Sequence, residues 1–79
     1  MPQFFFDLSE GDKAFQDTEG TELPDLEHAQ AEAVATLCQL AKDYPAGAEN
    51  MVLKAAIRSE AGQVLLVASL SLVVQSQLS

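Results

Sequence analysis

The chain has 79 residues, with 12 acidic and 4 basic side chains, a net charge of −8 and a single cysteine. This length suits one domain over residues 1–79, because it holds too little apolar material for two cores. A lone cysteine excludes both an intramolecular disulfide and a four-cysteine zinc site. The acidic balance disfavours nucleic-acid binding, which depends on Lys and Arg to neutralise phosphates.

The charge lies at one end of the sequence. Residues 1–32 hold nine acids against one base, Lys13, and residues 33–79 are neutral overall. The most apolar stretch, Val64–Val74, has 11 residues, whereas a membrane-spanning helix needs about 20. The first residues lack the basic region of a signal peptide. We therefore expect a cytoplasmic protein that does not enter a membrane.

The N-terminal segment predicts a β-hairpin. A strand at about residues 3–8 alternates, with Phe4 and Phe6 on one face and Phe5 on the other. A turn containing Gly11 follows, and a return strand is expected at about residues 13–17. Residues 18–22 form a polar break after this hairpin.

The helical period is clearest over residues 26–44. The apolar residues recur at intervals of three and four: Leu26, Ala29, Ala33, Leu37, Leu40 and Tyr44. Asp25 is the expected N-cap, because its carboxylate can accept free backbone N–H groups of the first turn. Pro45 and Gly47 are expected to end the helix.

Two further strands are expected at about residues 51–58 and 63–75, joined by a turn at Gly62. The first of them would face the core with Met51, Leu53, Ala55 and Ile57. The inward set of the last strand would be Val64, Leu66, Ala68, Leu70, Leu72 and Val74. The opposite face of the last strand is also largely apolar.

The order strand, strand, helix, strand, strand predicts an α+β fold of the ββαββ type. One helix would pack on one face of a four-stranded, mainly antiparallel sheet. If the strand order is 2-1-3-4, every neighbouring pair is antiparallel and the last strand is an edge.

Three segments together resemble a family of short proteins grouped as a domain of unknown function. They are the opening FFFD, the segment DTEGTELPDLEHAQAEA at residues 17–33, and RSEAGQVL at residues 58–65. The resemblance implies a small cytosolic protein from bacteria, mostly alphaproteobacteria, and supplies no activity or catalytic residues. LPDLEHAQAEA is also similar to the helix start of antitoxin partners of small ribonuclease toxins. This chain departs from them by lacking an extra strand before the helix and an appended DNA-binding segment.

Two single residues are candidates for chemistry. His28 is the only histidine, and it could pair with Glu32 one helical turn later, so we interpret it as a surface residue. Cys38 lies mid-helix beside apolar neighbours, without the cationic or helix-N-terminal surroundings that make a thiol reactive, so we expect a buried structural cysteine.

An acidic cluster precedes the helix, and hard cations such as calcium bind several oxygens from one loop. Its members are Asp17, Glu19, Glu22 and Asp25. The EF-hand pattern fails here, because aligning Gly20 puts Phe15 and Leu26 at obligatory ligand positions. A weak, irregular metal site and a simply solvated loop both stay open. We expect no cofactor, and no residue pair is spaced as the acid and base of an enzyme.

Apolar residues on the face that one helix cannot cover predict an interface. They are Leu65, Val67 and Val73, with Phe5 and Val52. A homodimer through that face or through the last strand's edge would cover them. The sequence thus favours a dimeric interaction or regulatory module, which could meet a protein partner with a basic surface. The alternative is a small-ligand or metal-binding protein that uses the acidic loop.

Overall fold

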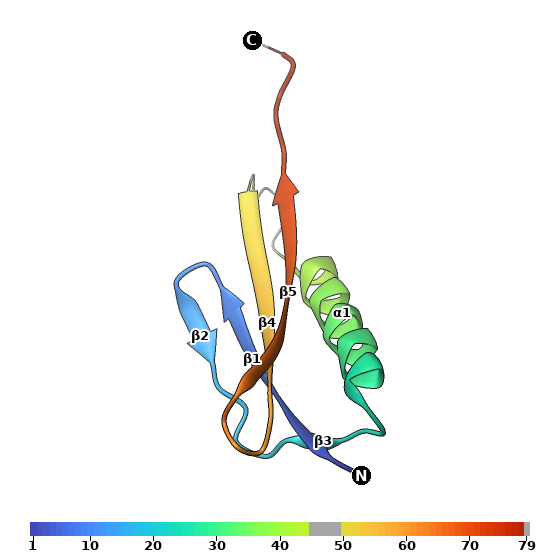
Figure 1. Cartoon of the computed structure of the whole chain (residues 1–79). Coiled ribbons are helices and arrows are strands. Elements are labelled where there is room, and N and C mark those ends of the chain that lie inside the picture. Colours follow the sequence, from blue (N-terminus) through green and yellow to red (C-terminus); the bar gives the residue numbers. More distant parts are fainter. Residues whose placement is uncertain (45–49, 79) are drawn as a thin grey trace.

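The structure is a computed structural model that describes residues 1–44 and 50–78. Its elements are β1 (Gln3–Glu10), β2 (Lys13–Phe15), β3 (Thr21–Glu22), α1 (Leu26–Lys42), β4 (Asn50–Arg58) and β5 (Val64–Val73). The helix lies along one face of the sheet, and the two chain ends point to opposite ends of the molecule (Figure 1). The predicted α+β fold, with one helix packed on an antiparallel sheet, is confirmed.

The strands follow the order β2-β1-β4-β5, and every neighbouring pair is antiparallel. This is the 2-1-3-4 arrangement considered from the sequence. A short strand that the sequence did not predict, β3, also pairs with β1, through Gln3↔Glu22 and Phe4↔Thr21. The segment interpreted as a polar break thus contains a strand, so the sheet has five strands rather than four.

The core lies between α1 and the middle of the sheet. Its buried residues are Phe4, Ala29, Ala33, Leu37, Met51, Leu53, Ala55 and Ile57. The inward face predicted for residues 51–58 is confirmed in β4, where Leu53, Ala55 and Ile57 are fully buried. Alanines at the centre of the helix interface leave room for the helix to approach the strands closely.

Two predicted boundaries differ from the structure for local reasons. The strand β2 ends at Phe15 rather than at residue 17, because the backbone N–H of Asp17 donates to the Asp7 carboxylate instead of continuing the ladder. The helix ends at Lys42, two residues early, with Asp43 as its C-cap. The predicted helix terminators, Pro45 and Gly47, lie outside the described residues.

The last strand is shorter than the predicted 63–75, and only its centre is covered by the helix. Leu66, Ala68 and Leu70 pack against the core as predicted. The remaining members are not buried, because Val64, Leu72 and Val74 are 54%, 45% and 53% exposed. Leu72 lies on the inward face as predicted, opposite the buried Met51, whereas Val64 pairs with the outward Arg58 and Val74 follows the end of the strand. A 17-residue helix is about 25 Å long and a ten-residue strand about 33 Å, so the ends of β5 extend past α1.

Candidate functional site

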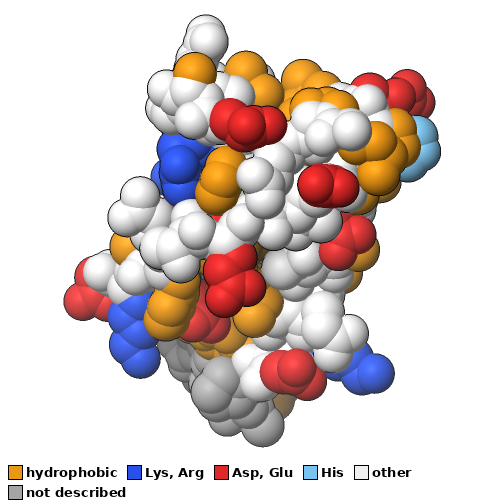
Figure 2. Space-filling model, turned by 90° about the horizontal axis from the view of Figure 1, so that it is seen from below, with side chains coloured by type: hydrophobic (Ala, Val, Ile, Leu, Met, Phe, Trp, Pro, Cys, Tyr) orange, Lys and Arg blue, Asp and Glu red, His pale blue; other side chains and the backbone are white. Residues whose placement is uncertain are grey.

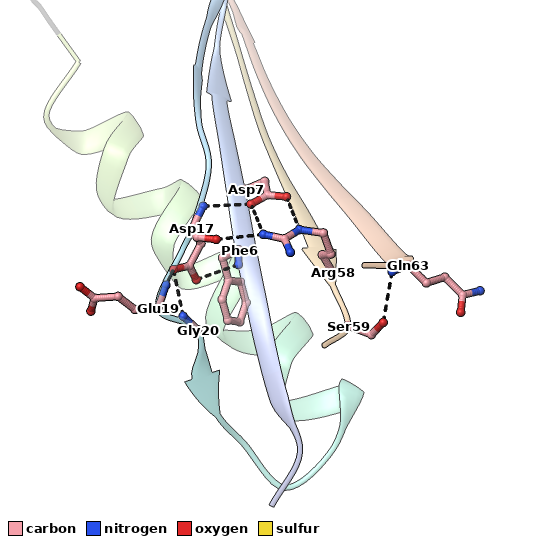
Figure 3. A network of polar contacts seen from close by, with 8 residues as sticks. All are labelled: Phe6, Asp7, Asp17, Glu19, Gly20, Arg58, Ser59 and Gln63. Atoms are coloured by element: carbon pink, nitrogen blue, oxygen red, sulfur yellow. Dashed lines mark hydrogen bonds and ion pairs between the residues drawn. The ribbon is translucent and has the colours of Figure 1, made fainter. Parts of the chain in front are cut away.

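An ion pair joins two neighbouring strands on the face opposite the helix. The Nε atom of Arg58 on β4 donates to Oδ2 of Asp7 on β1 at 2.9 Å, and its Nη2 atom donates to Oδ1 at 3.3 Å (Figure 3). The side chains are only 20% and 28% exposed. The guanidinium also lies over the ring of Phe5, 4.7 Å from its centroid. Arg58 is therefore held by two residues of β1.

Asp17 connects this pair to the loop between β2 and β3. The backbone N–H of Phe6 donates to Asp17 Oδ2 at 3.1 Å. Phe6 lies between the part of β1 that pairs with β3 and the part that pairs with β2, so it has no strand partner on this side. The other carboxylate oxygen accepts the N–H groups of Glu19 and Gly20, both at 3.0 Å. The backbone carbonyl of Asp17 accepts from Arg58 Nη2 at 2.9 Å. The Asp17 side chain thus replaces a missing strand partner.

The loop returns to β1 through Gly20, whose φ is +76°. A Cβ atom at this position would lie 3.0 Å from Gln3 Cγ and 3.0 Å from Phe5 Cε1. Only glycine combines a positive φ with such a close approach. The Phe5 ring is therefore covered by Arg58 and by the Gly20 backbone.

The pKa values of the network follow from these contacts. The pKa of Asp7 is lowered, chiefly by the hydrogen bond from Arg58. Burial opposes ionisation of Asp17, but the N–H donors of Gly20, Phe6 and Glu19 outweigh it and lower the Asp17 pKa. The pKa of Arg58 is raised by its hydrogen bond to Asp7. All three groups are held in their charged forms. Asp7 and Arg58 bond each other through their side chains, and Asp17 bonds both of them through its backbone N–H and carbonyl, so we call these three residues the clamp.

The structure separates the members of the acidic cluster. Asp17 is in the clamp, and Asp25 caps α1 by accepting the N–H of His28 at 2.9 Å, as predicted. Glu19 and Glu22 are exposed. Among residues 1–44 and 50–78, no group of three or more His, Cys, Asp or Glu residues could hold a metal ion.

The His28 ring is on the surface and bonds Asp25, not Glu32. Its Nδ1 atom lies 2.7 Å from Asp25 Oδ1, and both side chains are more than half exposed. This contact raises the pKa of His28 and lowers that of Asp25.

The buried position expected for Cys38 was wrong, because the thiol side chain is exposed. Cys38 lies five residues after the buried Ala33, which places it about 140° around the helix from the sheet. The helix has the sheet on one side only, so a residue at this angle meets solvent.

The predicted interface residues divide into two groups. Leu65, Val67, Val73 and Val52 are exposed, at 38%, 55%, 64% and 45%. Phe5 is half-buried beneath Arg58 and Gly20. The exposed group lies on β5 and on its neighbour β4.

The clamp was not foreseen from the sequence, although one signal was available. Asp7 and Arg58 both fall on the outer positions of strands that become neighbours in the 2-1-3-4 order. The chain pairs Phe5 with Arg58 in the ladder, which sets Asp7 diagonally across from the guanidinium.

No helix within residues 1–44 and 50–78 has the length and apolarity needed to cross a membrane. No curated protein and no solved structure matches the chain. One family model matches residues 3–71, which run from the start of β1 almost to the end of β5. The chain belongs to the family described as a domain of unknown function, DUF6894.

Proposed function

We propose that this protein is a homodimeric interaction module of the bacterial cytoplasm, with a binding rather than a catalytic role. The observation that supports this proposal is the exposed, uncharged edge formed by β5. This ten-residue strand is at the edge of the sheet, has no charged side chain, and exposes apolar side chains on both faces. A second copy is the occupant that we assign to it.

An edge of this kind needs a cover. It presents a row of backbone N–H and C=O groups, and proteins usually protect such edges with charges, proline, bulges or a covering segment. The β4–β5 ladder has one bulge-like register shift, between Ile57 and Arg58, next to the turn that joins the two strands. Residues 61–79 contain no charged residue and no proline. Self-association would pair the backbone groups and remove apolar side chains from water together.

The acidic half of the molecule supports a second contact, with a basic protein. The net charge of −8 comes from residues 1–32, which form β1, β2, β3 and the first turns of α1. Seen from the end that carries β3, acidic side chains are spread over the surface and outnumber basic ones (Figure 2). A contact made by these exposed charges should weaken as salt is added.

The dimer is tested by light scattering behind size exclusion over a range of protein concentrations. We expect a mass near twice the 8.5 kDa of the chain. Val67→Lys places a charge on the outer face of β5. It should lower the mass toward the monomer if the two sheet faces stack, and leave the dimer intact if the copies join through the backbone edge of β5. Ala35→Lys adds the same charge on an exposed helix position and should leave the mass unchanged. A monomer at every concentration up to the millimolar range would overturn the dimer.

The basic partner is tested by affinity capture from the source cell at low and at high salt. We expect a basic protein to co-purify at low salt and to be released as salt rises. Capture that does not respond to salt would contradict an acidic contact and point to the apolar residues of β5.

A further inference from the structure

We infer that two copies join antiparallel through their β5 edges, about a twofold axis perpendicular to the sheet. The result is one continuous sheet with both helices side by side on the same face. This inference rests on the proposed dimer and specifies how it is built.

The alternative, stacking of the two outer sheet faces, is opposed by the composition of that face. Ladder partners place Lys54 opposite Ser69 and Val52 opposite Ser71. Lys54 and Ser69 therefore lie between the apolar pair Leu65 and Val67 at one end of the face and the apolar pair Val52 and Val73 at the other end, where Ser71 lies beside Val52. Stacking would bury these polar groups at the centre of the interface, and within the described residues Lys54 has no acidic partner to accompany it.

The edge carries no such interruption. From Leu66 to Val73 the ladder with β4 is regular, so the opposite edge of β5 offers a regular row of backbone groups. Two identical strands that run antiparallel satisfy each other's groups about a twofold axis. The exposed apolar residues at both ends of β5 would then lie beside those of the second copy.

The helices provide an independent check on this geometry. The helix α1 packs on β4 and β5, the two strands nearest to the edge. Neighbouring strands are about 4.8 Å apart, so a helix above the middle of this pair lies about 5 Å from the twofold axis. The two helices would be about 10 Å apart, which is the packing distance of helices in proteins.

The side of the helix that faces the edge follows from the connection. Because β3 and β4 are both antiparallel to β1, they are parallel to each other, and α1 is a crossover between them. Such crossovers are right-handed, which turns the flank containing Val34 and Cys38 toward β5. Both residues are exposed, Val34 at 46%. In the dimer this flank would face its own copy.

The charges at the helix ends also suit this arrangement. The acidic residue of the first turn of α1 is Glu27, and the basic residue of the last turn is Lys42. The two helices run antiparallel, so the first turn of one lies beside the last turn of the other. The positive N-terminal end of one helix dipole thus lies beside the negative C-terminal end of the other, where a parallel pair would bring like ends together.

The native Cys38 is a built-in probe for this inference, because it is the only thiol and it is exposed. A nitroxide on Cys38 of the wild-type chain allows pulsed electron paramagnetic resonance to measure the distance between copies. Edge pairing sets the helix axes about 10 Å apart, whereas stacked sheets set them about 30 Å apart, on opposite outer surfaces. We expect the short distance, together with crosslinking of the dimer by a short bifunctional maleimide.

The matched control is Cys38→Ser combined with Gln39→Cys, which moves the probe to an exposed position six residues after Ala33, about 240° around the helix and therefore on the flank that faces away from β5. Its distance should be longer than that of Cys38, and its crosslinking weaker. A dimer with the long Cys38 distance would overturn edge pairing and leave the proposed dimer standing. A monomer in the light-scattering experiment would overturn both.

Discussion

The two edges of the sheet are built in opposite ways. On the side away from β4, β1 pairs with β2 and β3, and between them its backbone is bonded by the Asp17 side chain; we call this side the closed edge. Asp7 on β1 also forms an ion pair with Arg58. The edge formed by β5 has neither a covering segment nor a charge within the described residues. Short strands and charged side chains disfavour further pairing at the first edge, while the long, uncharged β5 leaves a second edge that another strand can extend.

Of the changes at the closed edge, Gly20→Ala should lower the free energy of unfolding most. The change forces a side chain into a positive φ, which costs about 1–2 kcal/mol, and into contact with Phe5, which costs about 1–3 kcal/mol more. Urea unfolding should show a loss of about 2–5 kcal/mol in the free energy of unfolding. Gly62→Ala is the matched control, because its φ is +87° but nothing lies within 4 Å of the added Cβ. Equal losses in the two variants would contradict the close packing at Gly20.

Asp17→Ala should be the next most damaging change. It removes the acceptor of three backbone N–H groups, and we expect a loss of about 2 kcal/mol in the free energy of unfolding. Glu22→Ala removes the same charge from an exposed side chain and should change stability by less than about 0.5 kcal/mol. If both variants lose the same free energy of unfolding, the loss comes from the change in net charge and not from the hydrogen bonds of the Asp17 carboxylate.

Acid should weaken the closed edge through the same groups. The pKa values of Asp7 and Asp17 are lowered from 3.8, so their contribution is present above that value and is lost as pH falls through the lower, folded-state pKa values. Urea midpoints should therefore fall as pH drops below about 4. Arg58→Met removes the main cause of the Asp7 shift, so its midpoint should fall less steeply over the same range. An unchanged slope in that variant would contradict the ion pair.

The smallest effect on stability is expected at the helix N-terminus. Its pH dependence is opposite to that of Asp7 and Asp17, because stability is lost as pH rises. The pKa of His28 is raised from 6.5 by Asp25, so this contribution is complete below pH 6.5 and is lost as pH rises through the higher, folded-state pKa. Thermal midpoints should decrease slightly between pH 6 and pH 8. Asp25→Ser keeps a capping oxygen but not the ion pair, and its midpoint should not change over this range.

Some elements could be predicted because their pattern depends only on neighbours along the chain. The stripe that includes Ala29, Ala33 and Leu37 has the helical period, and these residues are the buried ones. The alternation of Leu53, Ala55 and Ile57 has the strand period, and β4 buries that face. Asp25 caps the helix through a contact only three residues away.

The errors concern contacts between residues far apart in the sequence. The sequence suggests Asp17 as a member of a possible cation site, but its carboxylate accepts the backbone N–H of Phe6 in β1, eleven residues earlier. Arg58 forms its ion pair with Asp7, which is 51 residues away in the sequence. Cys38 and the ends of β5 were expected to be buried, yet α1 is covered on one side and is shorter than the strand.

Composition and periodicity by themselves determined the fold class, the position of the helix and the segregation of charge into residues 1–32. Each depends on residue types within one turn or one strand. The pairing of β3, the clamp of Asp7, Asp17 and Arg58, and the exposure along β5 were decided only by tertiary structure. They depend on which strands become neighbours and on how far one helix reaches across a sheet, and local sequence does not encode either.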